Sequence, residues 1–162
     1  MAEQPPARSL AREPVDSDVD LHRGRQPAHR RGELAVLLVV SVGGSAGAGA
    51  RYLLGLAFAQ PFGSFPWTTF AINVAGSALI GVLMVLVTDV WTQRRLIRPF
   101  LGTGVLGGFT TFSTFAVDIQ TLTGAGHAGL ALLYLAATPI LAVLAVWATA
   151  STTRRLITWR TR

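Results

Sequence analysis

The stretch Gly107-Gly108-Phe109-Thr110-Thr111-Phe112-Ser113-Thr114-Phe115 lies within a segment apolar enough to cross a bilayer. It nevertheless combines two glycines, four hydroxyl side chains and three phenylalanines. Glycine weakens a helix by about 1 kcal/mol relative to alanine, and a polar group buried in hydrocarbon is costly unless it has a partner. We therefore predict that the helix is interrupted between Gly107 and Thr114, and that the interruption lines an internal cavity or coordinates an ion.

The composition is that of a small membrane protein. Hydrophobic residues make up 51% of the 162 residues and charged residues only 14%, with a mean hydropathy of +0.47. All basic residues are arginines, concentrated in the two tails and one loop, so the high isoelectric point does not indicate a nucleic-acid partner. The sequence has no cysteine, which excludes disulfides and thiolate metal sites.

Four long apolar segments predict an all-α membrane protein with four transmembrane helices, at residues 34–59, 68–88, 96–122 and 128–150. Each reaches the roughly 20 residues that a helix needs to cross a bilayer. Residues 1–33 are rich in arginine, acidic residues and proline, and predict a disordered N-terminal extension. Residues 34–150 then form the transmembrane domain, and residues 151–162 a basic C-terminal tail.

The arginines predict how the helices are oriented in the cell membrane. With four spans, every arginine except Arg51 lies on the side that holds both termini and the loop between the second and third spans. Loops rich in arginine stay in the cytoplasm. We therefore expect a multi-pass protein of the plasma membrane with both termini cytoplasmic.

Polar residues recur on one face of the second and fourth spans. Thr69, Asn73 and Ser77 are spaced four residues apart, so they share a helix face. The Asn73 amide would either join helices, at about 1 kcal/mol per hydrogen bond, or donate to a passing anion. Tyr134 and Thr138 repeat this spacing, and Tyr134 would alternatively pack as an aromatic residue of the membrane interface.

In the first span, Gly43 and Gly47 form a face of small residues that lets another helix approach closely. Arg51 follows on nearly the same face. Its guanidinium would either reach a water-filled vestibule, where it would attract anions, or anchor the helix at the lipid headgroups.

Taken in order, these motifs resemble the Fluc (CrcB-type) fluoride channels. The resemblance is carried by the nine-residue stretch, by Gly43-x3-Gly47-x3-Arg51-Tyr52 and by Thr69-x3-Asn73-x2-Gly76, and it extends over about residues 34–150. It implies a fluoride-specific ion channel that lowers cytoplasmic fluoride by passive export. It also implies two subunits packed antiparallel, with the pores along their interface.

The resemblance assigns roles to individual residues. It implies a structural sodium ion, not transported, held at the dimer centre by the backbone carbonyls of Gly107 and Thr110, and it places Arg51 in the vestibule. Ala142 lies where related channels often carry a hydroxyl. The residues expected along the fluoride pore are Asn73, Phe112, Phe115, Thr114, Tyr134, Thr138 and Thr69.

The placement of the arginines on one side of the membrane also predicts the kind of subunit with which this chain pairs. Many members of this family insert in both orientations and pair with themselves, which needs balanced charges. This chain is expected to insert one way and to pair with an oppositely oriented homologue.

Three rival classes fit the sequence less well. A proton-coupled multidrug exporter needs a carboxylate in mid-span, whereas Glu33 and Asp89 lie at span edges and Asp118 lies past the expected interruption. A non-conducting membrane adaptor would not explain the aligned polar faces. An enzyme is not expected, because no pair of nucleophile and base is evident.

Overall fold

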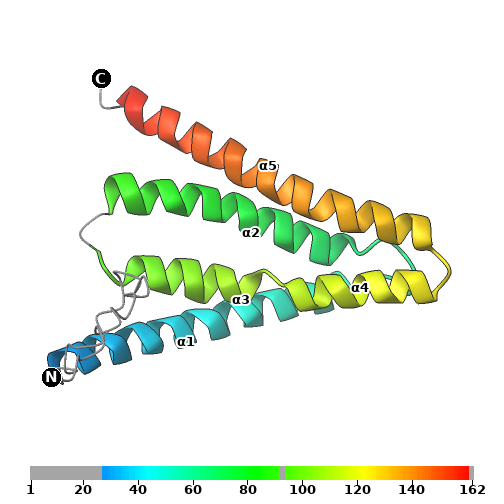
Figure 1. Ribbon diagram of the computed structural model, residues 1–162, viewed down its shortest axis with the longest axis horizontal. Coiled ribbons are helices and arrows are strands. Elements are labelled where there is room, and N and C mark those ends of the chain that lie inside the picture. Colours follow the sequence, from blue (N-terminus) through cyan, green and yellow to red (C-terminus); the bar gives the residue numbers. More distant parts are fainter. Residues whose placement is uncertain (1–26, 92–93, 161–162) are drawn as a thin grey trace, which may run out of the picture.

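The computed structural model describes residues 27–91 and 94–160, and only the backbone of residues 27–31 and Arg160. All of its regular elements are helical, and Figure 1 shows them as an elongated bundle. In chain order they are α1 (Pro27–Ala57), α2 (Trp67–Val85), the π-helical turns η1 (Leu86–Val90) and η2 (Arg98–Leu106), α3 (Gly107–Phe109), α4 (Phe112–Gly124) and α5 (Ala128–Arg160).

Four stretches of the described chain are long and apolar enough to cross a membrane, which confirms the predicted all-α membrane fold with four spans. They are Gly32–Ala57, Trp67–Val90, Arg98–Gly124 and Ala128–Trp159.

Two boundaries differ from the expected ones. The first helix already begins at Pro27, before residue 34, because proline fits the first position of a helix and the arginines after it tolerate helical backbone. Residues 27–33, expected to be disordered, are therefore helical. The rest of that extension lies outside the described residues, so its disorder stays a prediction. The basic C-terminal segment is also helical as far as Arg160.

Glycines set the distance between α1 and the third span. A Cβ atom placed on Gly43 would lie 2.6 Å from the carbonyl oxygen of Phe100, and one on Gly47 would overlap the carbonyl of Val105. The backbones of α1 and η2 can therefore approach only because these positions lack side chains. This is the close contact that the small-residue face predicted, and it brings Arg51 of α1 within hydrogen-bond distance of Gly108 in α3.

We expect Gly47→Ala to destabilise the fold and Gly49→Ala to stabilise it. Overpacking of this kind costs about 1–3 kcal/mol. Gly49 is exposed on the same helix with no atom within 4 Å of its would-be Cβ, so alanine there gains up to about 1 kcal/mol of helix propensity. Melting temperatures in detergent would compare the two variants. Equal melting temperatures would contradict the proposed contact of α1 with η2.

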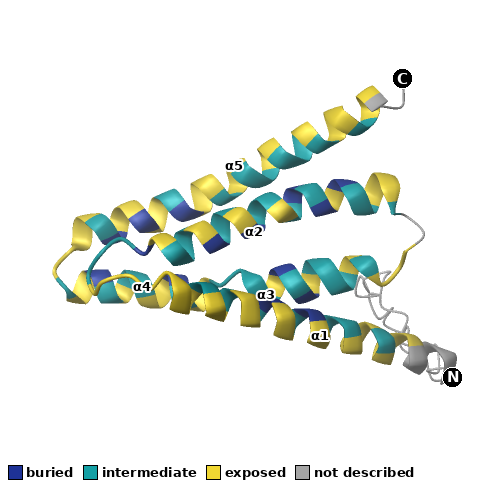
Figure 2. Cartoon of the chain, turned by 180° about the vertical axis from the view of Figure 1, so that it is seen from behind, coloured by how far each residue is buried: buried dark blue, intermediate teal, exposed yellow. Residues whose placement is uncertain are grey.

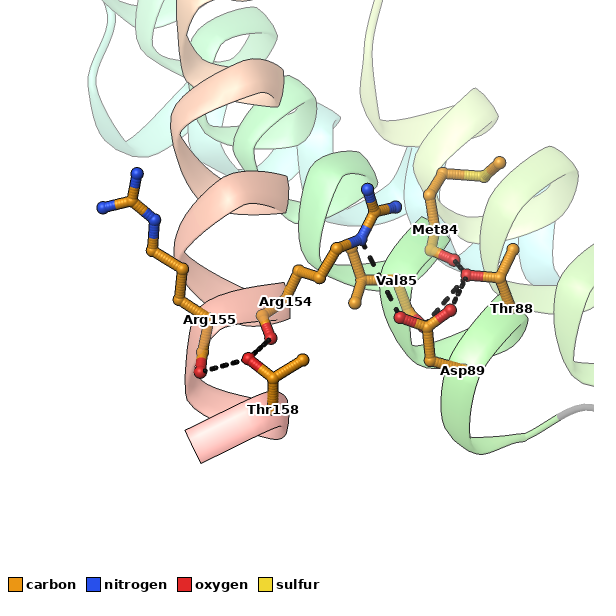
Figure 3. Close-up of polar contacts among 7 residues, drawn as sticks. All are labelled: Met84, Val85, Thr88, Asp89, Arg154, Arg155 and Thr158. Carbon is orange, nitrogen blue, oxygen red and sulfur yellow. Dashed lines mark hydrogen bonds and ion pairs between the residues drawn. The ribbon is translucent and has the colours of Figure 1, made fainter. Parts of the chain in front are cut away.

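Most of the described arginines are in segments that meet at one end of the bundle. In Figure 1 the start of α1, the connection from η1 to η2 and the end of α5 are at one end of the bundle. Figure 3 shows the ion pair there between Asp89 and Arg154, at 3.9 Å, and Thr158 donating to the carbonyl of Arg155. The Arg154 side chain is 68% exposed, so this pair adds little stability.

The buried core of the subunit is small and lies where α4 packs on α5. Its largest cluster consists of Phe115, Leu122, Ala131 and Tyr134, with Phe65 and Phe70 against it. Other buried hydrophobic residues lie on α2 and η2, namely Ile72, Leu83, Val85 and Leu106. Figure 2 shows exposed residues along the outer faces of the helices. Many are large and apolar, among them Leu37, Leu132 and Trp147. Such faces suit lipid or a second membrane subunit rather than water.

Candidate functional site

Two residues between α3 and α4 have extended backbone. Thr110 has φ −75° and ψ 154°, and Thr111 has φ −147° and ψ 126°. The hydroxyl of Thr110 donates to the carbonyl of Leu106 at 2.9 Å, which closes the end of α3. The hydroxyl oxygen of Thr111 accepts the N–H of Thr114 at 3.1 Å and so caps the start of α4.

Asn73 of α2 holds this extended backbone at two points. Its Oδ1 accepts the N–H of Thr111 at 2.8 Å, and its Nδ2 donates to the carbonyl of Thr111 at 2.9 Å. The amide thereby supplies the partners that an intact helix would have supplied. Asn73 thus joins helices, which was one of the two roles left open. The second hydrogen on Nδ2 is not used in this pair and can serve an anion.

The carbonyls of Gly107 and Thr110 are also affected by the extended backbone. In a continuous helix they would accept the N–H groups of Thr111 and Thr114. Those N–H groups instead donate to Asn73 and to the Thr111 hydroxyl. Gly107 and Thr110 line the same cavity. Backbone oxygens of this kind are ligands that suit a hard cation.

Arg51 reaches the third span from α1. Its Nε donates to the carbonyl of Gly108 at 3.2 Å, next to the interruption. The side chain is therefore partly buried against the third span. It binds the backbone and at the same time lines a cavity.

Two cavities lie beside the extended residue Thr111. The first, of about 440 Å³, also contains Ser77 and Ala142, and the second, of about 350 Å³, also contains Thr68 and Asp118. Of the residues predicted for the site, the first cavity holds Asn73, Gly107, Thr110, Phe112, Phe115 and Thr138. The second holds Arg51, Thr69 and Thr114. All predicted site residues except Tyr134 thus line one of these two cavities.

The two phenylalanines have different environments. Phe112 is 81% exposed, whereas Phe115 is 7% exposed and packs on Tyr134, with ring centroids 4.9 Å apart. Their own centroids are 5.8 Å apart and their rings are tilted. Phe112 is therefore available to a ligand or a second subunit, while Phe115 is also part of the core.

The two predicted residues of α5 are both buried. Tyr134 has no exposed surface, and Thr138 is 5% exposed. The Thr138 hydroxyl donates to the carbonyl of Tyr134 at 2.9 Å, so its proton is used within the helix. The Tyr134 hydroxyl donates to Oδ2 of Asp118 at 3.2 Å. Tyr134 lines neither of the two cavities itself, but its partner Asp118 lines the second one.

Sequence reasoning missed Asp118 and Thr111. Asp118 was noted only as lying past the interruption, although it is the one acidic residue between positions 98 and 124. That isolation is the signal that could have found it, because a carboxylate within a span needs a partner. No sequence pattern indicated Thr111 by itself, because its contacts depend on how the backbone folds.

The fold and the site define a multi-pass membrane protein with two cavities between its helices that share the extended residue Thr111. Residues 38–150 match the family described as CrcB-like protein, Camphor Resistance (CrcB), and the chain belongs to that family. This confirms the resemblance inferred from the motifs.

Curated relatives support the assignment. The chain is 53% identical over 130 residues to "Fluoride-specific ion channel FluC 1" of Streptomyces coelicolor, covering 80% of this chain and 84% of the relative. It is 59% identical over 118 residues to "Fluoride-specific ion channel FluC 2" of Streptomyces avermitilis, covering 70% and 75%. It is 48% identical over 128 residues to "Fluoride-specific ion channel FluC 2" of Nocardia farcinica, covering 74% and 91%. These names describe ion channels and not enzymes, in agreement with the expectation from the sequence.

Proposed function

We propose that this chain is a subunit of a fluoride-specific ion channel that lowers cytoplasmic fluoride by passive export. The observation that carries the proposal is the first cavity, whose polar lining residues are an amide and hydroxyls and include no charged side chain. Fluoride is small and holds water tightly, so a pore has to offer donors in place of that water. In the first cavity hydroxyls and an amide do this without a charged side chain that would trap the ion.

In this proposal the third span is broken in mid-membrane and two subunits pack antiparallel. The first cavity supports a second subunit, because its amide and hydroxyls would otherwise face lipid, and the exposed ring of Phe112 lies beside them. Ring edges carry partial positive charge, which suits contact with an anion. Fluoride would then pass between the subunits along the cavity that contains Asn73, Phe112 and Phe115.

We further propose that a sodium ion binds the carbonyls of Gly107 and Thr110 at the dimer centre. Their helical N–H partners are engaged elsewhere, so the oxygens fit a hard cation. When bound, the ion supplies a fixed positive charge and joins the two interrupted spans. Transfer into sodium-free buffer is expected to shift the dimer toward monomer in size-exclusion chromatography. An unchanged elution profile would contradict the sodium site.

The partner in this proposal is a homologous subunit of opposite orientation, and the termini of this chain are cytoplasmic. The support is the placement of all arginines except Arg51 toward one side. Streptomyces avermitilis has relatives named FluC 2 and FluC 3, so one organism can encode several such chains.

Growth of bacteria that lack fluoride export tests this function. Cells that produce the chain together with a homologue from the same genome are expected to grow at fluoride concentrations that stop the parent strain. Either protein alone is expected to give no protection. Growth with the chain alone would contradict the need for a second homologue. A lack of protection in every combination, with both proteins present in the membrane, would contradict the function.

A further inference from the structure

We propose that the hydroxyls of Thr111 and Thr114 form a reversible pair that passes fluoride from one cavity to the other. This inference rests on the proposed channel function and adds a transfer step between its two cavities. Among the described residues, Thr111 is the one that lines both cavities. Thr114 lines the second cavity, which also contains Arg51 and Asp118, and the Asp118 carboxylate accepts a hydrogen bond from Tyr134.

The backbone holds Thr111 at the boundary between the cavities. Its N–H and carbonyl are both bound by the Asn73 amide, at 2.8 and 2.9 Å. Its hydroxyl oxygen also accepts the N–H of Thr114 at 3.1 Å, so the side chain is fixed toward α4. What remains free is the rotation of the hydroxyl proton.

The two hydroxyls share one hydrogen bond, so one of their two protons is always left over and can point into a cavity. The Thr111 hydroxyl donates to Oγ1 of Thr114 at 3.1 Å, which leaves the proton of Thr114 available to the second cavity. If both hydroxyls rotate, Thr114 donates to Thr111, and the proton of Thr111 becomes available to the first cavity. One donor is offered in each state, and no covalent bond changes. The Oγ of Ser113 lies 3.3 Å from Thr111, but Ser113 lines neither cavity.

This arrangement suits an ion that must not lose all its donors while it crosses the boundary. Fluoride accepts hydrogen bonds strongly, and a hydrogen bond to a charged group is worth more than one between neutral groups. A donor that switches sides can stabilise the ion before and after the crossing. Without the switch we expect transport to slow about tenfold.

Four variants test the pair by fluoride efflux from proteoliposomes, measured with a fluoride electrode in the subunit combination that conducts. Thr111→Val removes the hydroxyl with little change in shape, and Thr111→Ser retains it. Thr114→Val removes the second hydroxyl but keeps the N–H that Thr111 caps. Thr121→Val is the matched control, because Thr121 is on the same helix, donates to the carbonyl of Val117 and lines neither cavity.

We expect Thr111→Val and Thr114→Val each to slow efflux about tenfold, and the double variant to be no slower than either one. Thr111→Ser restores most of the rate lost in Thr111→Val, and Thr121→Val conducts like the wild type. Thr114→Val should lose rate without losing melting temperature, which a merely structural role would not produce.

Two results would overturn the inference while the channel function stands. One is wild-type efflux from Thr114→Val. The other is a double variant whose loss is the product of the two single losses, since independent sites would behave in that way. Absence of efflux from the wild-type preparation would instead overturn the proposed function, and this inference with it.

Discussion

Replacement of Asn73 by aspartate is expected to reduce fluoride efflux about 1000-fold. The ionised carboxylate has no proton to donate to the carbonyl of Thr111, which the amide binds at 2.9 Å. It also places a negative charge beside the first cavity, where repulsion of an anion at about 4 Å costs roughly 4 kcal/mol at an effective dielectric constant of about 20. The neutral acid uses its single proton on Thr111 and leaves none for fluoride.

A matched control tests whether the effect depends on position 73 or only on the change from amide to carboxylate. Gln120→Glu makes the same change of amide to carboxylate on an exposed residue of α4 that lines neither cavity. It is expected to leave efflux at the wild-type rate. If Asn73→Asp conducted as well as Gln120→Glu, the amide of Asn73 would have no part in the pathway.

Replacement of Phe112 by isoleucine is expected to slow efflux at least about 100-fold with little change in the fold of the subunit. Isoleucine keeps an apolar side chain but lacks the positive ring edge. A loss of this size corresponds to about 2.7 kcal/mol of ion stabilisation. Because the Phe112 ring is 81% exposed, its removal costs the subunit little packing. Efflux rates and circular dichroism melting curves would be measured on the same preparation.

Two further phenylalanine variants make this result specific. Phe62→Ile changes a ring that is 84% exposed and lines neither cavity, so both efflux and melting should stay unchanged. Phe115→Ile removes a ring packed on Tyr134 and should lower the melting temperature as well as the rate. Wild-type efflux from Phe112→Ile would remove this ring from the proposed pathway.

The four spans could be predicted from the sequence because length and hydropathy decide whether a segment can cross a bilayer. The start of α1 could not be predicted in this way. Helical backbone continues past the apolar segment to Pro27, and nothing in the hydropathy of residues 27–33 separates helix from coil. That another helix packs closely on Gly43 and Gly47 followed from their spacing, but which span does so could not be predicted.

The site was predictable where residue type determines the chemistry and not where contacts between spans determine it. Glycines and hydroxyls indicated Thr110 and its neighbours. The two-point binding of Thr111 by Asn73, and the hydrogen bond from Tyr134 to Asp118, join residues that are far apart in sequence. Arg51 was expected in a vestibule or at the headgroups, and its bond to Gly108 depends on how closely α1 packs.

Fluoride efflux from proteoliposomes tests the central claim most directly. Vesicles loaded with fluoride and containing the wild-type chain, with its homologue where needed, are expected to release fluoride as soon as valinomycin and potassium compensate the charge. Vesicles with Asn73→Asp in its place should release it no faster than empty liposomes. Equal release from all three preparations would contradict a fluoride pathway through these cavities.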